Sequence, residues 1–135
     1  MKRGASYVLD SYAVLAFLEN EEGAVKVEEI LQAAIQGEAE IWISILNLGE
    51  VLSIIEREQS LQAAQKAIAI VDRWPVRIAA ADRSRTFAAA HVKALHAVSY
   101  ADAFAVALGQ EVGGIVVTGD PEFRSAESLV KVEWL

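Results

Sequence analysis

The sequence contains no cysteine and only two histidines among its 135 residues. The absence of cysteine excludes disulfide bonds, thiolate metal sites and cysteine nucleophiles. His91 and His96 are five positions apart, so they do not share a helical face and lack the spacing of metal ligands. No apolar run approaches the roughly 20 residues that a membrane-spanning helix needs. We therefore expect no membrane-spanning segment and no thiol chemistry.

The length and composition are those of a globular domain. A chain of 135 residues that is 54% hydrophobic and 23% charged can bury a substantial core, so we expect one domain over residues 1–135. Residues 1–3 are basic, but Asp10 and Glu19 interrupt the apolar stretch that follows, unlike in a signal peptide. We expect a cytoplasmic protein.

The formal net charge is −7, from 19 acidic and 12 basic residues. This balance argues against bulk electrostatic attraction to nucleic acid. Part of the negative charge, however, lies on acidic residues in apolar surroundings, where bound divalent cations would offset it. The charge therefore weakens a nucleic-acid hypothesis without removing it.

Segments with strand and helix patterns alternate along the chain. We expect strands at 6–9, 41–43, 76–78 and 115–118, with a short edge strand at 130–133. We expect helices at 11–18, 21–35, 45–58, 61–73, 83–95 and 99–112. This alternation predicts an α/β fold with a mostly parallel sheet of four to five strands. The strands at 6–9 and 115–118 are almost wholly apolar, as expected when helices cover both faces of the sheet.

Four acidic residues lie where apolar residues are expected: Asp10, Glu50, Asp102 and Asp120. Asp10 and Asp120 follow apolar strands, whereas Glu50 and Asp102 lie in early turns of apolar helices. An ionised carboxylate in such surroundings is costly unless it finds a partner, and the only basic residue within four positions of any of them is Arg124. The carboxyl ends of parallel strands and the helices that follow them share one edge. We therefore expect the four carboxylates to converge there around a metal.

Each of these acids also has a structural explanation as part of a helix cap. Asp10 and Asp120 stand where an N-cap residue would precede the next helical turn. Residues 47–50 and 99–102 resemble capping boxes, although Ser44 offers a better N-cap for the first of these helices. Four caps gathered at one predicted edge are the less favoured explanation.

Four segments resemble motifs of the PIN domain family (PilT N-terminus), and within it the VapC-like toxins of toxin–antitoxin pairs. The segments are Val8-Leu9-Asp10-Ser11, Asn47-Leu48-Gly49-Glu50-Val51, Ser99-Tyr100-Ala101-Asp102-Ala103 and Val117-Thr118-Gly119-Asp120-Pro121-Glu122-Phe123. Their order and spacing cover nearly the whole chain. The resemblance implies a Mg²⁺- or Mn²⁺-dependent ribonuclease, usually dimeric and held inactive by a small antitoxin.

The resemblance also implies roles for particular residues. The family's acidic residues map onto the four acids named above, Asp10, Glu50, Asp102 and Asp120. A frequent second acid of the last motif maps onto Glu122, which is glutamate here where aspartate is usual. Ser11 and Thr118 match polar positions that the family places near the metal.

The chemistry of these side chains agrees with that implication. Hard oxygen ligands without histidine or cysteine select Mg²⁺ or Mn²⁺ over Zn²⁺. We assign Asp10, Asp102 and Asp120 to metal binding, and Glu50 either to binding through a water or to orienting the attacking water. Several carboxylates about 4 Å apart repel one another, so at least one acid should have a raised pKa when no metal is bound.

Two other functions are compatible with a small acidic α/β chain. A receiver-like phosphoacceptor domain also binds Mg²⁺, but Asp10 lacks an adjacent second acid and the strand at 76–78 does not end in an aspartate. A haloacid-dehalogenase phosphatase is less favoured, because the Asp10 segment lacks that motif's second aspartate. A catalytically silent PIN-like interaction protein is the other alternative, against which the intact acidic set argues.

Overall fold

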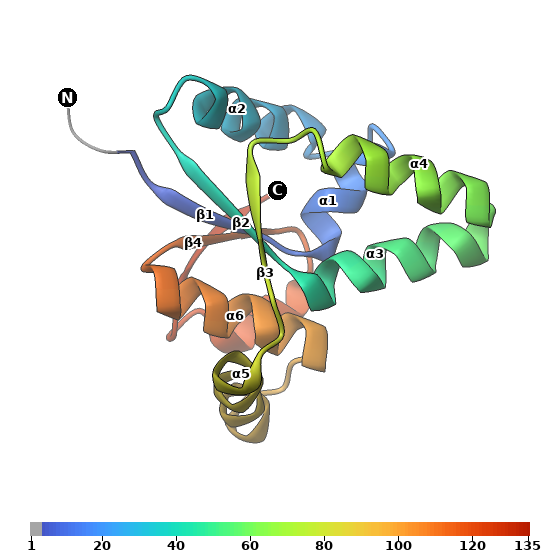
Figure 1. Ribbon diagram of the computed structural model, residues 1–135. Helices are drawn as coiled ribbons and strands as arrows, with labels where there is room; N and C mark the ends of the chain where they lie inside the picture. Colours follow the sequence, from blue (N-terminus) through green and yellow to red (C-terminus); the bar gives the residue numbers. More distant parts are fainter. Residues whose placement is uncertain (1–3) are drawn as a thin grey trace.

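Five parallel strands form the centre of the molecule (Figure 1). The computed structural model describes residues 4–135, so the basic residues 1–3 lie outside the described part. The strands are β1 (Ser6–Leu9), β2 (Glu40–Ser44), β3 (Val76–Ala79), β4 (Ile115–Thr118) and β5 (Lys131–Trp134). The expected α/β fold is confirmed, with every strand pairing parallel.

The strand order across the sheet is β3-β2-β1-β4-β5. In this order β1 and β4 are neighbours, with Leu9 opposite Val117 in the register. The carboxyl ends of these two strands therefore lie side by side. A receiver-like domain has the order 2-1-3-4-5, with the third strand beside the first. The observed topology excludes that alternative.

Helices cover both faces of the sheet (Figure 1). They are α1 (Ser11–Leu18), α2 (Ala24–Ile35), α3 (Ile45–Glu58), α4 (Leu61–Val71), α5 (Arg83–Leu95) and α6 (Tyr100–Val112), with a 3₁₀ helix, η1, at Pro121–Ala126. Helices α1 to α4 contribute to the apolar core on one face, and α5, α6 and η1 contribute to the core on the other. None of the described helices is long and apolar enough to cross a membrane.

Successive residues of the central strands face opposite cores. Val8 and Val116 belong to the core beneath α5 and α6, whereas Leu9 and Val117 belong to the core beneath α1 to α4. All four side chains are fully buried. Strands buried on both faces must be apolar at every position, which explains why no alternation of polar residues marks them in the sequence.

Most element boundaries match their predictions, and the differences have local causes. Helix α2 begins at Ala24 rather than at residue 21, because Gly23 has a left-handed φ of 96° and forms the N-cap. The helix expected at 99–112 begins one residue later, since Ser99 is its N-cap. The helix expected at 61–73 ends at Val71, and the edge strand is shifted by one residue to Lys131–Trp134.

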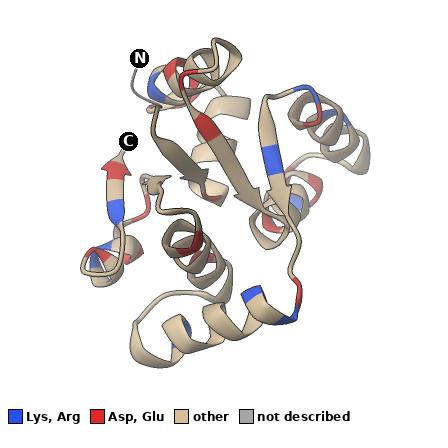
Figure 2. Ribbon diagram, turned by 60° about the vertical axis from the view of Figure 1, so that its left-hand side comes forward, with Lys and Arg blue, Asp and Glu red and all other residues tan. Residues whose placement is uncertain are grey.

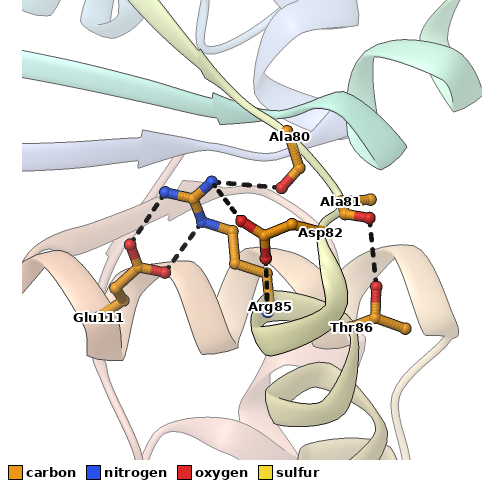
Figure 3. A network of polar contacts seen from close by, with 6 residues as sticks. All are labelled: Ala80, Ala81, Asp82, Arg85, Thr86 and Glu111. Atoms are coloured by element: carbon orange, nitrogen blue, oxygen red, sulfur yellow. Dashed lines mark hydrogen bonds and ion pairs between the residues drawn. The ribbon is translucent and has the colours of Figure 1, made fainter.

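An arginine joins the two helices on the second face (Figure 3). The Arg85 guanidinium of α5 donates two hydrogen bonds of 3.0 Å to the Glu111 carboxylate of α6. It also donates to the carbonyl oxygen of Ala80 at 3.3 Å and lies 3.5 Å from a carboxylate oxygen of Asp82. The Arg85 guanidinium therefore links α5 to α6.

Candidate active site

The four acids singled out in the sequence lie at the carboxyl edge of the sheet. Asp10 directly follows β1, and Asp120 lies two residues beyond β4. Asp102 is in the first turn of α6, and Glu50 lies one turn into α3, the helix that directly follows β2. Because β1 and β4 are paired, the two strand-end acids are brought to the centre of the edge.

The Asp10 carboxylate is buried and held at both oxygens. Its side chain is 1% exposed. Oδ1 accepts the backbone N–H of Ala13 at 2.8 Å, so Asp10 is the N-cap of α1, and Oδ2 accepts a hydrogen bond from the Thr118 hydroxyl. The capping explanation is thus correct for Asp10. It does not exclude a ligand role, because each carboxylate oxygen has a second lone pair.

Thr118 links the two strand-end acids. Its hydroxyl donates to Asp10 and accepts the backbone N–H of Asp120 at 3.0 Å. Asp120 in turn accepts the N–H of Glu122 at 2.9 Å and forms the N-cap of η1, with Pro121 in its first turn. The turn between β4 and η1 is therefore held by the hydrogen bonds of Thr118 and Asp120.

Three carboxylates form the tightest acidic group in the described part of the chain. One oxygen from each of Asp102, Asp120 and Glu122 lies within 4.8 Å of the other two. Asp102 is buried, Asp120 is half-buried and Glu122 is exposed. A single cation with oxygen ligands could be reached by all three.

Glu122 also completes the cap of α6. The Ser99 hydroxyl accepts the N–H of Asp102 at 3.2 Å, whereas the Ser99 N–H donates to Glu122 Oε1 at 3.1 Å. The capping box suggested for residues 99–102 is therefore half correct, since the reciprocal acid is Glu122 rather than Asp102. The box suggested for residues 47–50 is wrong, because the N-cap of α3 is Ser44 and Asn47 lies inside the helix.

Burial and mutual repulsion raise the pKa of two of these acids. Burial is the largest cause of the rise in the pKa of Asp10 from 3.8 to about 7, with smaller contributions from the charges of Asp120 and Glu50. The hydrogen bonds from Thr118 and Ala13 oppose that rise. Burial, followed by the charges of Asp10 and Asp120, raises the pKa of Asp102 from 3.8 to about 8.

The expected rise in the pKa of at least one acid is found for Asp10 and Asp102, although burial contributes more to it than the repulsion between carboxylates. The charge of Asp120 contributes to both raised pKa values, and the charge of Asp10 contributes to that of Asp102. Glu50 is half-buried and stands, like Asp10, outside the group of three closest carboxylates. Its charge nevertheless contributes to the raised pKa of Asp10.

Sequence reasoning missed the part that Asn47 plays beside the site. Its side chain is 0% exposed, and Nδ2 donates to the Ser11 hydroxyl at 3.1 Å and to the carbonyl oxygen of Ala101 at 3.2 Å. The Ser11 hydroxyl itself donates to the backbone oxygen of Asn47 at 3.2 Å. The signal in the sequence was a polar residue within an otherwise apolar turn of α3, three positions before Glu50.

The residues present fit a hard divalent cation. The convergent donors are carboxylate oxygens, with no histidine or cysteine among them. Burial is the main cause of the raised pKa values of Asp10 and Asp102, and no Lys or Arg of the described chain lowers either pKa. A bound cation would compensate their negative charge.

The sequence pattern of the PIN domain matches residues 7–129, which include all four acids and Glu122. The chain belongs to the PIN domain family. A search of curated protein sequences finds no match to this PIN domain.

Solved structures with the same fold include VapC and VapBC proteins. The VapBC2 complex of Rickettsia felis, bound to a DNA fragment from its promoter, has a TM-score of 0.75 at 14% identity, over 95% of this chain and 97% of that chain. DNA-bound VapBC of Salmonella typhimurium has a TM-score of 0.73 at 15% identity, over 96% and 97%. VapC20 of Mycobacterium tuberculosis, a toxin that cleaves the sarcin-ricin loop, has a TM-score of 0.71 at 18% identity, over 89% and 94%. At these identities the likeness shows the fold.

Proposed function

We propose that this PIN domain is a Mg²⁺- or Mn²⁺-dependent endoribonuclease that hydrolyses phosphodiester bonds of RNA. The observation that carries the proposal is the convergence of Asp102, Asp120 and Glu122 within 4.8 Å, beside the buried carboxylate of Asp10. Membership of the PIN family supports it independently. The whole described chain, as one domain, provides the scaffold.

The proposed ligands are Asp10, Asp102 and Asp120, with Glu122 within reach of the same cation. When bound, the divalent ion lowers the pKa of a water and offsets charge on the phosphate. Thr118 holds the Asp10 carboxylate in one orientation by its hydrogen bond to Oδ2. Ser11 supports the site indirectly, since its hydroxyl pairs with Asn47.

Glu50 is the candidate for orienting the attacking water. It is half-buried, its charge acts on Asp10, and its carboxylate forms no hydrogen bond or ion pair with the described residues. A carboxylate in that state can accept a hydrogen bond from a water as it attacks phosphorus, while the ribose 3′-oxygen leaves. No protein nucleophile is required for this hydrolysis.

RNA recognition would depend on the metal site more than on a basic surface. The Lys and Arg residues of the described chain are spread over several elements (Figure 2). Several are already engaged: Arg85 pairs with Glu111, and the guanidinium groups of Arg77, Arg83 and Arg124 lie over aromatic rings. With few phosphate contacts, RNA binding should depend only weakly on salt concentration.

The same fold supports a role as the toxin of a type II toxin–antitoxin pair. The similar structures include VapBC complexes and a toxin that cleaves the sarcin-ricin loop. A small antitoxin and a second copy of this chain are the partners we propose, in the cytoplasm. Large apolar side chains that are more than half exposed occur on α2, α4 and α5, where a partner could cover them: Val25, Ile35, Leu61, Phe87 and Leu95.

A ribonuclease assay tests the proposal. The wild-type protein should cleave total cellular RNA in Mn²⁺ or Mg²⁺, stop in EDTA, and leave DNA of the same length intact. Asp120→Asn should abolish cleavage, whereas Asp72→Asn, the same change at an exposed residue that ends α4, should not. A catalytically silent PIN domain would cleave nothing, and cleavage that persists in EDTA would exclude the metal mechanism.

A further inference from the structure

The side chain of Asn47 connects two helices that carry acids of the candidate site. It projects from α3 and donates from Nδ2 to Ser11 Oγ at 3.1 Å and to the Ala101 carbonyl oxygen at 3.2 Å. Ser11 is the residue after Asp10, and Ala101 is the residue before Asp102. One amide nitrogen therefore joins the start of α1 to the start of α6.

The orientation of this amide is determined by its partners. A backbone carbonyl oxygen only accepts hydrogen bonds, so the nitrogen rather than the oxygen of the amide must face Ala101. Asn47 Oδ1 then points away from both partners and has no hydrogen-bond partner among the described residues. The side chain uses both donors and leaves its acceptor buried and unpaired.

Neither partner oxygen needs Asn47 in order to be satisfied. The Ser11 hydroxyl also donates to the backbone oxygen of Asn47, a contact that any residue at this position would keep. Ala101 lies within the first turns of α6, where its carbonyl accepts the helical N–H of residue 105. An unpaired buried acceptor opposes folding, so an apolar residue of similar size should be tolerated by the fold.

We propose that Asn47 is a positioning residue of the metal site, which sets the separation of Asp10 and Asp102. The proposal rests on the metal-dependent function proposed above. The two hydrogen bonds of Asn47 hold the residue after Asp10 and the residue before Asp102 at a fixed separation, and with them the two acids. Groups hydrogen-bonded to metal ligands commonly contribute 10- to 100-fold to metal affinity, and Asn47 acts one residue away from two proposed ligands.

The test compares Asn47→Leu with Ile55→Val. Leucine has the same number and branching of side-chain heavy atoms as asparagine, although it is bulkier, and it donates no hydrogen bond. Ile55 is a buried core residue of α3 two turns further along the helix. Mn²⁺ affinity is measured by titration calorimetry, and stability without metal is measured by urea unfolding in EDTA. Asn47→Leu should weaken Mn²⁺ binding about 10-fold or more with a near-normal urea midpoint. Ile55→Val should lower the midpoint and bind Mn²⁺ like the wild type.

The outcomes separate this inference from the proposed function. If Asn47→Leu binds Mn²⁺ as tightly as the wild-type protein, the positioning role is wrong, while the proposed metal site is unaffected. Absence of Mn²⁺ binding by the wild-type protein overturns both. If Asn47→Leu does not fold, Asn47→Ala gives the same comparison without added bulk, and its affinity must likewise fall about 10-fold. If Ile55→Val loses as much Mn²⁺ affinity as Asn47→Leu, general destabilisation explains the loss in both variants and the proposal is contradicted.

Discussion

The Thr118 hydroxyl donates a hydrogen bond to the carboxylate of Asp10, a residue 108 positions away in the chain. The contact exists because β1 and β4 pair in parallel with Leu9 opposite Val117, so the next residue of each strand reaches the edge at the same level. Both side chains are buried. The pair joins the two strand ends that carry proposed metal ligands, and it fixes which way the Asp10 oxygens face.

Replacing Thr118 by valine should destabilise the protein by about 1–3 kcal/mol, because the Asp10 carboxylate and the Asp120 N–H each lose a buried partner. The pKa of Asp10 should rise further, since the lost hydrogen bond opposes its rise. Urea unfolding at pH 7 measures the first effect. Thr118→Ser keeps the hydroxyl and should lose much less stability. Equal losses of stability in both variants would show that the methyl group of Thr118 is important rather than its hydroxyl.

Asp102→Asn should abolish RNA cleavage and yet stabilise the metal-free protein. The pKa of Asp102 is raised to about 8, so at pH 9 the wild-type protein buries a charge that repels Asp10 and Asp120. The asparagine variant lacks that charge. Its Tm in EDTA at pH 9 should exceed the wild-type value by about 3–10 °C. A lower Tm together with retained cleavage would favour a purely capping role for the acids at this edge.

The stability of the metal-free wild type should fall as the pH rises. The folded pKa values of Asp10 and Asp102, about 7 and about 8, lie above the ordinary value of 3.8. The stability that protonated Asp10 and Asp102 contribute is therefore complete below about pH 4. It is lost between about pH 4 and pH 8, and above that range the stability no longer changes with their ionisation. Thermal unfolding in EDTA between pH 5 and 9 measures this trend, which Asp102→Asn should flatten.

Mn²⁺ should reverse that dependence on pH. Carboxylates bind a metal only after they lose their protons, so affinity should increase across the pH range in which Asp10 and Asp102 ionise. The rise in Tm caused by a fixed excess of Mn²⁺ should be small at pH 5 and large at pH 9. A Tm increment that does not change with pH would place the bound metal away from these two acids.

Gly119→Ala should disturb the turn that carries Asp120. A Cβ atom at residue 119 would lie 2.2 Å from a ring carbon of Tyr12, so the ring or the turn must move. We expect a loss of about 1–3 kcal/mol in urea unfolding. The matched control is Gly49→Ala in α3, where a Cβ meets nothing within 4 Å and alanine should stabilise the helix by about 0.5–1 kcal/mol. Similar changes in both variants would contradict the close approach of Tyr12.

Much of this architecture could be predicted because its determinants are local. The apolar runs of β1 and β4, with an acid after each, already indicate buried parallel strands whose ends face one crevice. The helical periods and the caps at Ser44 and Ser99 likewise depend on neighbours in the chain. These features needed only the assumption that β1 and β4 are adjacent.

The remaining features depend on contacts between distant segments. The hydrogen bond from Ser99 N–H to Glu122 spans 23 positions, and that from Asn47 to Ala101 spans 54. No local pattern distinguishes an asparagine that links two helices from one in a capping box. The start of α2 was misplaced for a different reason, since the left-handed conformation of Gly23 is one that a glycine can adopt but need not.

Anomalous X-ray scattering from crystals of the wild-type protein grown with Mn²⁺ tests the central claim most directly. The acids from four separate segments should form one metal site at the carboxyl edge of the sheet. We predict an anomalous peak at about 2.0–2.3 Å from carboxylate oxygens of Asp102 and Asp120, with Asp10 bound directly or through a water. A fully occupied peak elsewhere, with none between these acids, would contradict the account.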